Sequence, residues 1–484
     1  MRRQSPLIGV AAGVAVLFLV LPALADRCDA QVLRYVVRAD PFEVQLTLPD
    51  GAKQIAQPRR EATHFYFLAE QGWPVPEGAS DTRVRCDIRW EGFPADWRLA
   101  NSFGIDRRSQ EFSTTLGELR KAVFAGGDFR IARSGEGLVL VTRGAWRFPD
   151  RETTDLLDGI AKVQTDIWRD RGLSGHLVFL LGTEKAAGQW GGEARTQAMV
   201  LELSLDTPQP VDAADGFAHE LFHTWNARRL NRTADERLYW FTEGVTEYYG
   251  VVTLWRSGIW SFERVLHMFN TVARQYFGSP VRNYTAARMV EHRKADFNAE
   301  RLPYLQGFLL AAHWNTSGRT MDRVLRNLMK TNREPLSNQR IADALKATGL
   351  AKAGEEIERF VVRGETIQLR ARIWGECASE SALDVRQFDI GFDSDESKKT
   401  GIIQGAREGS NAWEAGVRNG QRWAPMDVVW GDPGYLVELE IRDDQRGRRV
   451  KYYPASSNAS HAPQYTRTSS RGCDSQADAS SSRR

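Results

Sequence analysis

The sequence predicts a multidomain α+β protein in which two β-rich regions flank a mainly helical one. Apolar residues alternate in short runs across residues 28–135, as in half-buried strands. From residue 213 to about 363 they recur at helical spacing, and a second strand-rich stretch starts near residue 382. A chain of 484 residues can form two to four domains, each with its own core.

The composition excludes several classes of protein. With 65 Lys and Arg against 62 Asp and Glu, the net charge of +3 gives no electrostatic reason to expect a nucleic-acid partner. Apolar residues make up 42% and charged residues 26%, which is typical of a globular protein. Wholesale disorder and a multi-span membrane protein are therefore excluded.

The N-terminus has the pattern of a secretory signal. Arg2 and Arg3 precede an uncharged, largely apolar stretch that ends in Ala23-Leu24-Ala25, a small-x-small cleavage pattern. We expect residues 1–25 to be removed and the protein to be exported, either periplasmic or secreted, with no membrane span after cleavage. An uncleaved anchor is the alternative, because about 18 apolar residues can cross a bilayer.

The four cysteines are Cys28, Cys86, Cys377 and Cys473, and none forms a C-x-x-C pair, so a structural zinc ribbon is not expected. An exported protein permits disulfides. The most local pairing joins Cys28 to Cys86 and Cys377 to Cys473. The other pairings and free thiols remain open.

The domain boundaries follow from changes in pattern. Residues 26–150 are expected to form the β-rich N-terminal domain, and residues 151–378 the mainly helical one. The second domain opens with a helix over 153–169, where Leu and Ile recur at helical spacing, and it contains buried strands at 175–182 and 197–205.

The C-terminal part is predicted to be a small β domain over residues 379–456. Two strand-like runs, 435–441 and 450–453, flank a polar Asp-Asp-Gln-Arg-Gly stretch, as in a hairpin. Residues 457–484 are rich in Ser, Ala and Arg and are expected to be a disordered tail.

Residues 219–223 read His-Glu-Leu-Phe-His and form the expected chemical centre. On a helix, positions i and i+4 share one face, so His219 and His223 can bind one metal ion, and imidazole pairs suit Zn²⁺. Glu220 would lie beside the metal and take a proton from a water molecule. A pair of core histidines is the plain alternative.

A catalytic zinc site needs a third protein ligand and an open position. Glu243 lies on an expected second helix, and Glu247 follows one turn later on the same face. We favour Glu243 as the ligand and Glu247 as the support for a histidine. The reverse assignment, and Glu247 as a solvated charge, remain open.

Two segments resemble the glycyl aminopeptidase family of gluzincin zinc metallopeptidases. Residues 219–229 match its zinc helix, which ends in His-x-Trp-Asn-x-Lys/Arg-Arg, and residues 240–249 match its Glu-Gly-x-Thr-x-Tyr-Tyr ligand helix. The resemblance implies a β-rich N-terminal domain, a thermolysin-like catalytic domain and a C-terminal PDZ domain over residues 30–455. It also implies one zinc ion per chain and a peptide or protein substrate.

The PDZ expectation depends on residues 409–420, Gly-Ser-Asn-Ala-Trp-Glu-Ala-Gly-Val-Arg-Asn-Gly, which are similar to a stretch of bacterial PDZ domains. Gln421 stands where Asp is usual. Residues 390–392 could then receive the carboxylate of a C-terminal peptide, while the adjacent strand extends the sheet. A lid or a stabilising domain is the alternative role.

The sequence departs from the family at the strand that contacts substrate. The family has Gly-Gly-x-Glu-His there, and its Glu is thought to bind the free α-amine; this chain has Gly191-Gly-Glu-Ala-Arg195. A shift of one residue turns Glu193 to the other face of a strand. Endopeptidase action or a different end-group preference is therefore an alternative, and Arg195 is a candidate for a substrate carboxylate.

A second departure lies at residues 302–307, where the family has Tyr-Tyr-x-Lys-Gly and this chain has Leu-Pro-Tyr-Leu-Gln-Gly. Tyr304 keeps a phenol that can stabilise the oxyanion of the tetrahedral intermediate. Gln306 replaces the lysine. A core aromatic is the alternative role for Tyr304.

The sequence thus predicts an exported, aminopeptidase-like zinc metallopeptidase. His219, His223 and Glu243 would hold the metal, Glu220 would be the general base, and substrate would lie antiparallel to the 197–205 strand. The rival is a peptide-binding PDZ protein with little or no turnover. Hydrolysis of a non-peptide amide or ester uses the same chemistry and is a third possibility.

Overall fold

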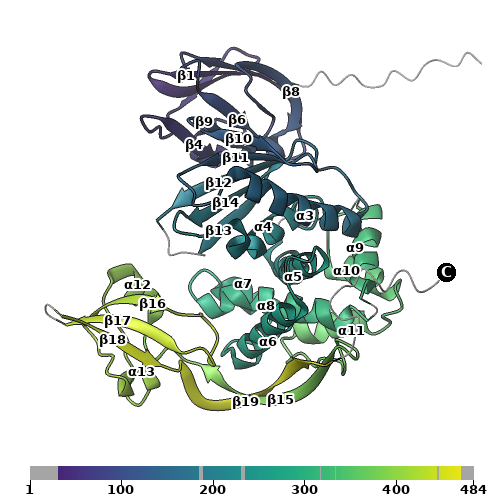
Figure 1. The fold of residues 1–484 in the computed structure, drawn as a ribbon. Helices are drawn as coiled ribbons and strands as arrows, with labels where there is room; N and C mark the ends of the chain where they lie inside the picture. The colour runs from purple at the N-terminus through teal and green to yellow at the C-terminus, as the bar shows by residue number, and fades with distance from the viewer. Residues whose placement is uncertain are drawn as a thin grey trace, which may run out of the picture.

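The computed structural model describes residues 31–469 except 185–188, 231–234, 317, 333 and 444–445. The predicted signal at 1–25 lies outside the described residues. The described chain runs from N-terminal sheets through a middle sheet and a layer of helices to a C-terminal β region (Figure 1).

The N-terminal region consists of two sheets around an aromatic core. The first has the strand order β3-β2-β1-β5-β8 and the second β4-β9-β6-β7. In the core, Trp73 stacks on Phe124 with ring centroids 3.8 Å apart. The elements are β1 (Gln31–Ala39), β2 (Phe42–Thr47), β3 (Lys53–Ala56), β4 (His64–Leu68), α1 (Ala69–Gly72), β5 (Arg83–Glu91), β6 (Arg98–Asn101), β7 (Gly104–Ile105), β8 (Ser109–Thr115), α2 (Leu116–Arg120) and β9 (Val123–Gly127).

The middle sheet has the order β10-β11-β12-β14-β13, in which β11, β12 and β14 run parallel. Its strands are β10 (Arg130–Arg133), β11 (Val139–Arg143), β12 (Leu177–Thr183), β13 (Trp190–Arg195) and β14 (Ala198–Ser204), and α3 (Asp150–Trp168) connects β11 to β12. The helix expected over 153–169 and the strands expected at 175–182 and 197–205 are therefore present. The boundary expected at residue 150 divides this sheet, because β11 pairs with β12.

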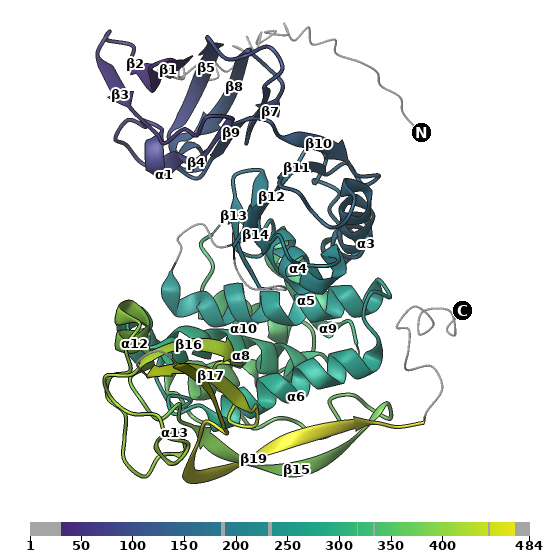
Figure 2. The same cartoon turned by 60° about the vertical axis from the view of Figure 1, so that its left-hand side comes forward.

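Both faces of the middle sheet are buried, with alternate residues on each. Val139, Phe179 and Val200 pack with residues of the second N-terminal sheet. Leu140, Leu180 and Leu201 pack with the helices. Most of the helices lie below the sheet in Figures 1 and 2, and α3 lies beside it. The sheet therefore joins the N-terminal region to the helical layer.

Helices dominate from residue 210 to 362, as the sequence predicts. Their bounds are η1 (Pro210–Ala213), α4 (Ala214–Phe222), η2 (Glu236–Leu238), η3 (Trp240–Gly244), α5 (Val245–Arg256), α6 (Phe262–Gly278), α7 (Ala286–His292), α8 (Phe297–Trp314), α9 (Thr320–Lys330), α10 (Asn338–Lys346), α11 (Ala353–Ile357) and η4 (Glu358–Val362). Among the helices in the described ranges, none is both long and apolar enough to cross a membrane.

The C-terminal β region has two parts. A small sheet of β16 (Arg422–Asp427), β17 (Val437–Asp443) and β18 (Arg446–Tyr452) has its own apolar core, and β17 and β18 form the expected hairpin. Two short helices, α12 (Ser394–Thr400) and α13 (Asn411–Glu414), accompany it. A long antiparallel ribbon of β15 (Ala378–Phe388) and β19 (Ala455–Arg467) lies against α6 (Figure 2).

The ribbon corrects the expected tail. Residues 457–484 were expected to be disordered from their composition, but 457–467 belong to β19. The side chain of Asn270 in α6 holds the strand, because its amide bonds both the N–H and the carbonyl of Tyr465 at 2.8 Å. Pairing with β15 and α6 supplies hydrogen bonds and burial that the local composition does not reveal.

The cysteines also differ from the most local pairing. Cys86 is a buried free thiol in β5, so the expected Cys28–Cys86 disulfide is wrong. Burial raises the pKa of Cys86 to about 12. Cys377 is disulfide-bonded, while Cys28 and Cys473 lie outside the described residues.

Candidate active site

Helix α4 carries His219, ends with His223 as its C-cap, and lies between the middle sheet and α5 (Figure 1). Nearly every residue of α4 is buried, so the helix is held by packing on both sides. His219 and His223 lie one turn apart on one face, as the spacing predicts. Their Nε2 atoms are 3.0 Å from each other.

Glu243 completes a group of three possible metal ligands. Its Oε2 lies 3.5 Å from His219 Nε2 and 3.2 Å from His223 Nε2. Zinc with bonds of about 2.0–2.1 Å in a tetrahedral site separates its ligand atoms by about 3.3 Å. The spacing and the chemistry of these donors therefore fit a zinc ion, and within the described ranges they form a candidate metal site.

The turn that bears Glu243 is held by backbone contact with α8. Glu243 lies in η3, a wide turn just before α5. A Cβ on Gly307 would lie 1.6 Å from the carbonyl oxygen of Trp240, and one on Gly244 would lie 2.5 Å from Gly307 Cα. Only glycines permit this approach, which fixes Glu243 relative to the side chains of α8.

Asn226, just beyond the zinc helix, links α4 to the same turn. Its side-chain amide donates to the Phe241 carbonyl at 2.9 Å and is 3.0 Å from the Thr246 hydroxyl. Asn226 is fully buried. The residue therefore positions Glu243 relative to the two histidines.

Glu247 has the supporting position rather than that of a third ligand. Its Oε2 lies 3.1 Å from Nδ1 of His219, the ring nitrogen that faces away from the metal group. Its other oxygen lies 3.1 Å from Arg301 of α8. Burial opposes ionisation of Glu247, but Arg301 and His219 outweigh it and lower its pKa to about 2. Sequence spacing gave no signal for Arg301, since only the packing of α8 brings it here.

Glu220 is buried against the edge strand of the middle sheet. A Cβ on Gly192 of β13 would lie 2.6 Å from Glu220 Cγ, so a glycine is required there. Within the described ranges, Glu220 Oε2 has no hydrogen-bond partner. Burial raises the pKa of the Glu220 carboxyl, and His223 and His219 oppose this rise. A buried carboxylate with a free oxygen thus lies beside the metal group.

Tyr304 comes to the same group from α8. The centroid of its ring lies 6.2 Å from that of His219, and the two rings are nearly parallel. The guanidinium of Arg301 lies over the same tyrosine ring, 5.2 Å from its centroid. Burial and the neighbouring Glu243 raise the pKa of its phenol, so Tyr304 keeps its proton. Gln306 is buried elsewhere and donates to the Phe360 carbonyl.

The register of β13 separates its side chains into two sets. Gly192 pairs with Leu201 and Ala194 with Met199, both on the face that packs against the helices. Glu193 pairs with Val200, on the opposite face. The glutamate therefore lies on the face away from Glu220, as the shift of one residue predicts.

Arg195 lies on that opposite face as well. It pairs with Ala198 in the register and forms ion pairs with Glu193 and, at 2.7 Å, with Glu70. Two carboxylates already neutralise this guanidinium, so the structure does not favour it as a receptor for a substrate carboxylate.

The expected position of a substrate strand changes. β14 is paired with β12 on one side and with β13 on the other, so it has no free edge and the expectation of substrate beside residues 197–205 is wrong. β13 is the edge strand at this end of the sheet. Its backbone is the one that a peptide beside Glu220 can reach.

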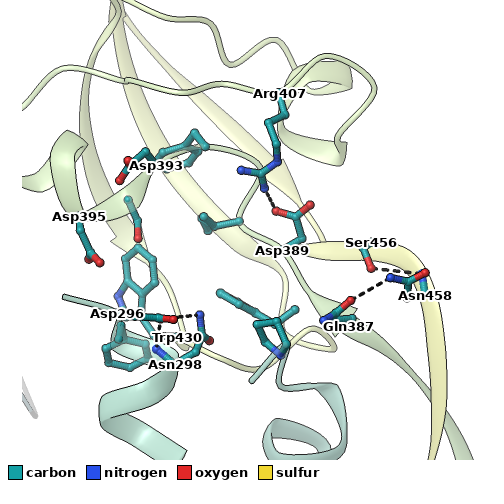
Figure 3. Close-up of a pocket in the computed structure, with 16 residues that line it drawn as sticks. Asp296, Asn298, Gln387, Asp389, Asp393, Asp395, Arg407, Trp430, Ser456 and Asn458 are labelled. Carbon is teal, nitrogen blue, oxygen red and sulfur yellow. Dashed lines mark hydrogen bonds and ion pairs between the residues drawn. The ribbon is translucent and has the colours of Figure 1, made fainter. Parts of the chain in front are cut away.

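The loop expected to bind a C-terminal peptide has a different environment. The N–H of Gly391 donates to the carboxylate of Asp389 at 2.8 Å, and Asp389 also forms an ion pair with Arg407 (Figure 3). The residues after the loop form helix α12, which Asp393 caps, and the strand next to the loop is β15, which pairs with β19. The loop thus already holds an internal carboxylate.

A hollow of about 530 Å³ lies beside this loop and the start of α8. Four carboxylates line it against one guanidinium, that of Arg407; they are Asp296, Asp389, Asp393 and Asp395 (Figure 3). This charge disfavours a peptide carboxylate.

Comparison with known proteins agrees with this site. Residues 213–301 match the profile of the M61 glycyl aminopeptidase family, a segment that contains His219, Glu220, His223, Glu243 and Arg301. No curated protein sequence matches the chain.

Three solved structures are similar to this chain over most of its length. A protein of the aminopeptidase N family from Idiomarina loihiensis has a TM-score of 0.59 at 13% identity, over 89% of this chain and 98% of that one. An M1 zinc metallopeptidase from Deinococcus radiodurans has a TM-score of 0.45 at 14% identity, over 70% of this chain and 95% of that one. Yeast LTA4 hydrolase in complex with bestatin has a TM-score of 0.43 at 14% identity, over 71% of this chain and 68% of that one.

The first of these likenesses shows the fold alone, whereas the sequence match covers the metal group itself. The His-His-Glu group has the spacing that zinc requires. Residues 213–301 therefore match the M61 glycyl aminopeptidase family, and the His219, His223 and Glu243 group is that of a gluzincin zinc metallopeptidase.

Proposed function

We propose that this protein hydrolyses peptide bonds by activating a water molecule, with His219, His223 and Glu243 as zinc ligands and Glu220 as the general base. The observation that supports this is the position of the buried Glu220 carboxylate, with one free oxygen, beside three converging ligands. When bound, zinc would supply a Lewis acid that polarises the scissile carbonyl and lowers the pKa of water.

The other catalytic roles belong to side chains around the metal group. Glu220 accepts the proton of the attacking water and passes it to the leaving amine. The protonated phenol of Tyr304 donates to the developing oxyanion. Glu247, held by Arg301, lies 3.1 Å from Nδ1 of His219, orients the ring and keeps Nε2 available as a ligand.

The backbone of β13 orients the substrate. Its free edge can pair with an extended peptide, and Gly192 lets that backbone lie directly against Glu220. This arrangement favours a peptide over a small amide or ester, because the added strand makes main-chain hydrogen bonds.

One observation favours a second candidate, cleavage that does not require a free N-terminal amine. The family glutamate that is thought to bind the α-amine has no counterpart on the helix-facing side of β13, since Ala194 lies there and Glu193 lies on the other face. We infer that the aminopeptidase activity of the family is relaxed here towards endopeptidase activity.

For the C-terminal region we propose a PDZ-like domain with a stabilising role. Residues 409–420 and the β17–β18 hairpin support the fold assignment. The internal Asp389 and the acidic hollow argue against capture of a C-terminal peptide. A peptide-binding protein without turnover is therefore the weaker alternative.

We also propose that residues 1–25 direct export, which N-terminal sequencing and fractionation of the expressed protein would test. Cleavage after Ala25 is expected. An intact N-terminus in the membrane fraction would favour the anchored form instead.

The decisive experiment pairs zinc analysis with peptide cleavage in wild type and Glu220→Gln. We expect one zinc ion per chain in both proteins, and a loss of about 10²–10⁴ in kcat for the variant. Glu291→Gln, an exposed carboxylate on α7, is the matched control and should keep full activity.

The peptides are supplied with free and with acetylated N-termini. Equal cleavage of both sets supports the endopeptidase candidate, and cleavage of free peptides alone supports an aminopeptidase. Bound zinc without cleavage of any peptide would contradict the proposed function, and absence of zinc would contradict the site assignment.

A further inference from the structure

A second cavity, of about 710 Å³, lies between the N-terminal region and the end of the zinc helix. Five segments line it: the loop before β5 with Asp81, α2 and its end with Lys121, the loop before β12 with His176, the β13–β14 turn with Gln197, and the segment after the zinc helix with Thr224 and Arg228. The proposed reaction uses none of these side chains.

The lining is rich in positive charge. Five basic side chains face two acidic ones, and three of the five are neutralised by neighbours. Arg195 pairs with Glu70 and Glu193, Arg228 pairs with Glu118, and Arg229 pairs with Asp170. The other two basic residues are Arg120 and Lys121, and the second acidic residue is Asp81.

Arg120 and Lys121 carry charges that no carboxylate in the described ranges pairs with. The guanidinium of Arg120 donates to the carbonyls of Pro76 and Gly78, which carry no net charge. Lys121 has neither an ion pair nor a side-chain hydrogen bond in those ranges. Partial burial and, after it, the nearby Arg228 lower the pKa of Lys121, while Glu118 opposes this shift.

Two buried polar atoms of the lining also lack partners. Within the described residues, His176 Nε2 and Thr224 Oγ1 have no hydrogen-bond partner, although their residues are only 6% and 9% exposed. A buried polar atom without a partner costs about 1–3 kcal/mol. In a cavity such atoms are available to a ligand that can supply the missing hydrogen bonds.

The cavity lies close to the reactive centre along the chain. Thr224 directly follows His223, and Arg195 ends β13 three residues after Gly192, which contacts Glu220. Three residues of strand span about 10 Å. A peptide that extends from Glu220 along the edge of β13 therefore reaches this cavity two or three residues from the cleaved bond.

We propose that this cavity is a subsite that receives a carboxylate of the peptide substrate, with Lys121 supplying the charge and Thr224 and His176 the hydrogen bonds. This inference rests on the proposed peptidase function. The carboxylate can come from an acidic side chain near the cleaved bond or from the C-terminus of a short peptide.

The test uses short acetylated peptides in which Glu, Gln or Lys occupies each position in turn, with either a free or an amidated C-terminus. We expect about tenfold higher kcat/KM for Glu than for Gln at one position, or for the free C-terminus over the amide. The two arms distinguish the two sources of the carboxylate. The preference should fall as salt is raised.

The variants Lys121→Ala and Thr224→Val should reduce that preference towards unity while cleavage of the Gln peptides stays near wild type. Lys162→Ala is the matched control, because Lys162 is an exposed lysine on α3 outside the cavity. Circular dichroism melting verifies that each variant is folded.

A binding assay separates failure of this inference from failure of the proposed function. Fluorescent Glu, Gln and Lys peptides are titrated into zinc-loaded Glu220→Gln protein and its Lys121→Ala derivative. Tighter binding of the Glu peptide that depends on Lys121 supports the subsite even if no peptide is cleaved. Equal binding and cleavage of all peptides, or a preference that survives both variants, would overturn it.

Discussion

The zinc group and the Gly391 loop both bring a carboxylate close to polar hydrogen-bonding groups, but they leave different atoms free. Around α4, two imidazole nitrogens and Glu243 converge, and Glu220 retains an oxygen without a partner within the described residues. Around Gly391, the carboxylate of Asp389 accepts from the backbone N–H and pairs with Arg407. The first arrangement needs an added ion, whereas the second is complete.

This difference distinguishes a binding site from a structural feature. Converging donor atoms without internal partners are costly unless a ligand satisfies them. A loop whose N–H groups already have a partner gains little from a ligand that offers the same interaction. The following predictions test that contrast, from the largest expected effect to the smallest.

Removal of the metal should have the largest effect. Glu243→Gln, or treatment of wild type with a chelator, should reduce peptide cleavage to the uncatalysed level, because the proposed site then lacks its Lewis acid. Added zinc should restore the chelated wild type. Persistent activity in a chelated sample that contains no zinc by atomic emission would contradict the assignment.

Gly192→Ala should lower kcat by about 10²-fold with zinc content unchanged. Its Cβ would lie 2.6 Å from Glu220 Cγ, so the base must move, and a displacement of 1 Å in a catalytic group can cost this much. Gly159→Ala, in α3, is the control, since its Cβ would meet only Ile259 at 3.6 Å and Ser257 at 4.0 Å, which are ordinary contacts. Wild-type kcat in Gly192→Ala would exclude Glu220 as the base.

Glu247→Gln should weaken zinc binding about 10–100-fold, as loss of a carboxylate that supports a histidine ligand does elsewhere. The measurement is competition with a zinc-binding dye, and Glu291→Gln is again the control. Loss of zinc as complete as that in Glu243→Gln would instead make Glu247 a direct ligand.

Gly391→Ala should have the smallest effect on cleavage and should act on stability. Gly391 has φ +87°, and a Cβ at this position would lie 2.5 Å from that of Ala412. Backbone strain and a steric clash would therefore both destabilise the variant. Gly409→Ala is the control, because φ is +77° and its Cβ meets nothing within 4 Å. Urea unfolding should show that the free energy of unfolding falls by about 1–3 kcal/mol in each variant because of backbone strain, and falls further in Gly391→Ala because of the clash.

If the C-terminal region only stabilises the protein, both glycine variants should keep the wild-type kcat/KM at a temperature where they remain folded. A large loss of cleavage in folded Gly391→Ala would give this region a direct part in substrate binding. The contrast between the two regions would then no longer hold.

Much of the arrangement could be predicted from the sequence where one element contains the whole pattern. His219 and His223 share a face because a helix repeats every 3.6 residues, and the β17–β18 hairpin follows from two apolar runs around a polar turn. The shift of Glu193 to the far face of β13 also follows, since strand side chains alternate.

Contacts between distant segments could not be predicted in this way. The local composition of residues 457–467 predicted disorder, but β15 and α6 supply the missing partners of β19. The boundary at residue 150 failed because the parallel pairing of β11 with β12 joins strands on both sides of α3.

The sequence by itself predicted the proposed metal ligands and base, and it determined the mainly helical layer that carries them, because local periodicity fixes which side chains share a face. Only the tertiary structure brought Arg301 to Glu247, Gly192 against Glu220, and Lys121 to the cavity beside Thr224. These contacts join residues far apart in the chain, and their energies depend on packing that no local pattern encodes.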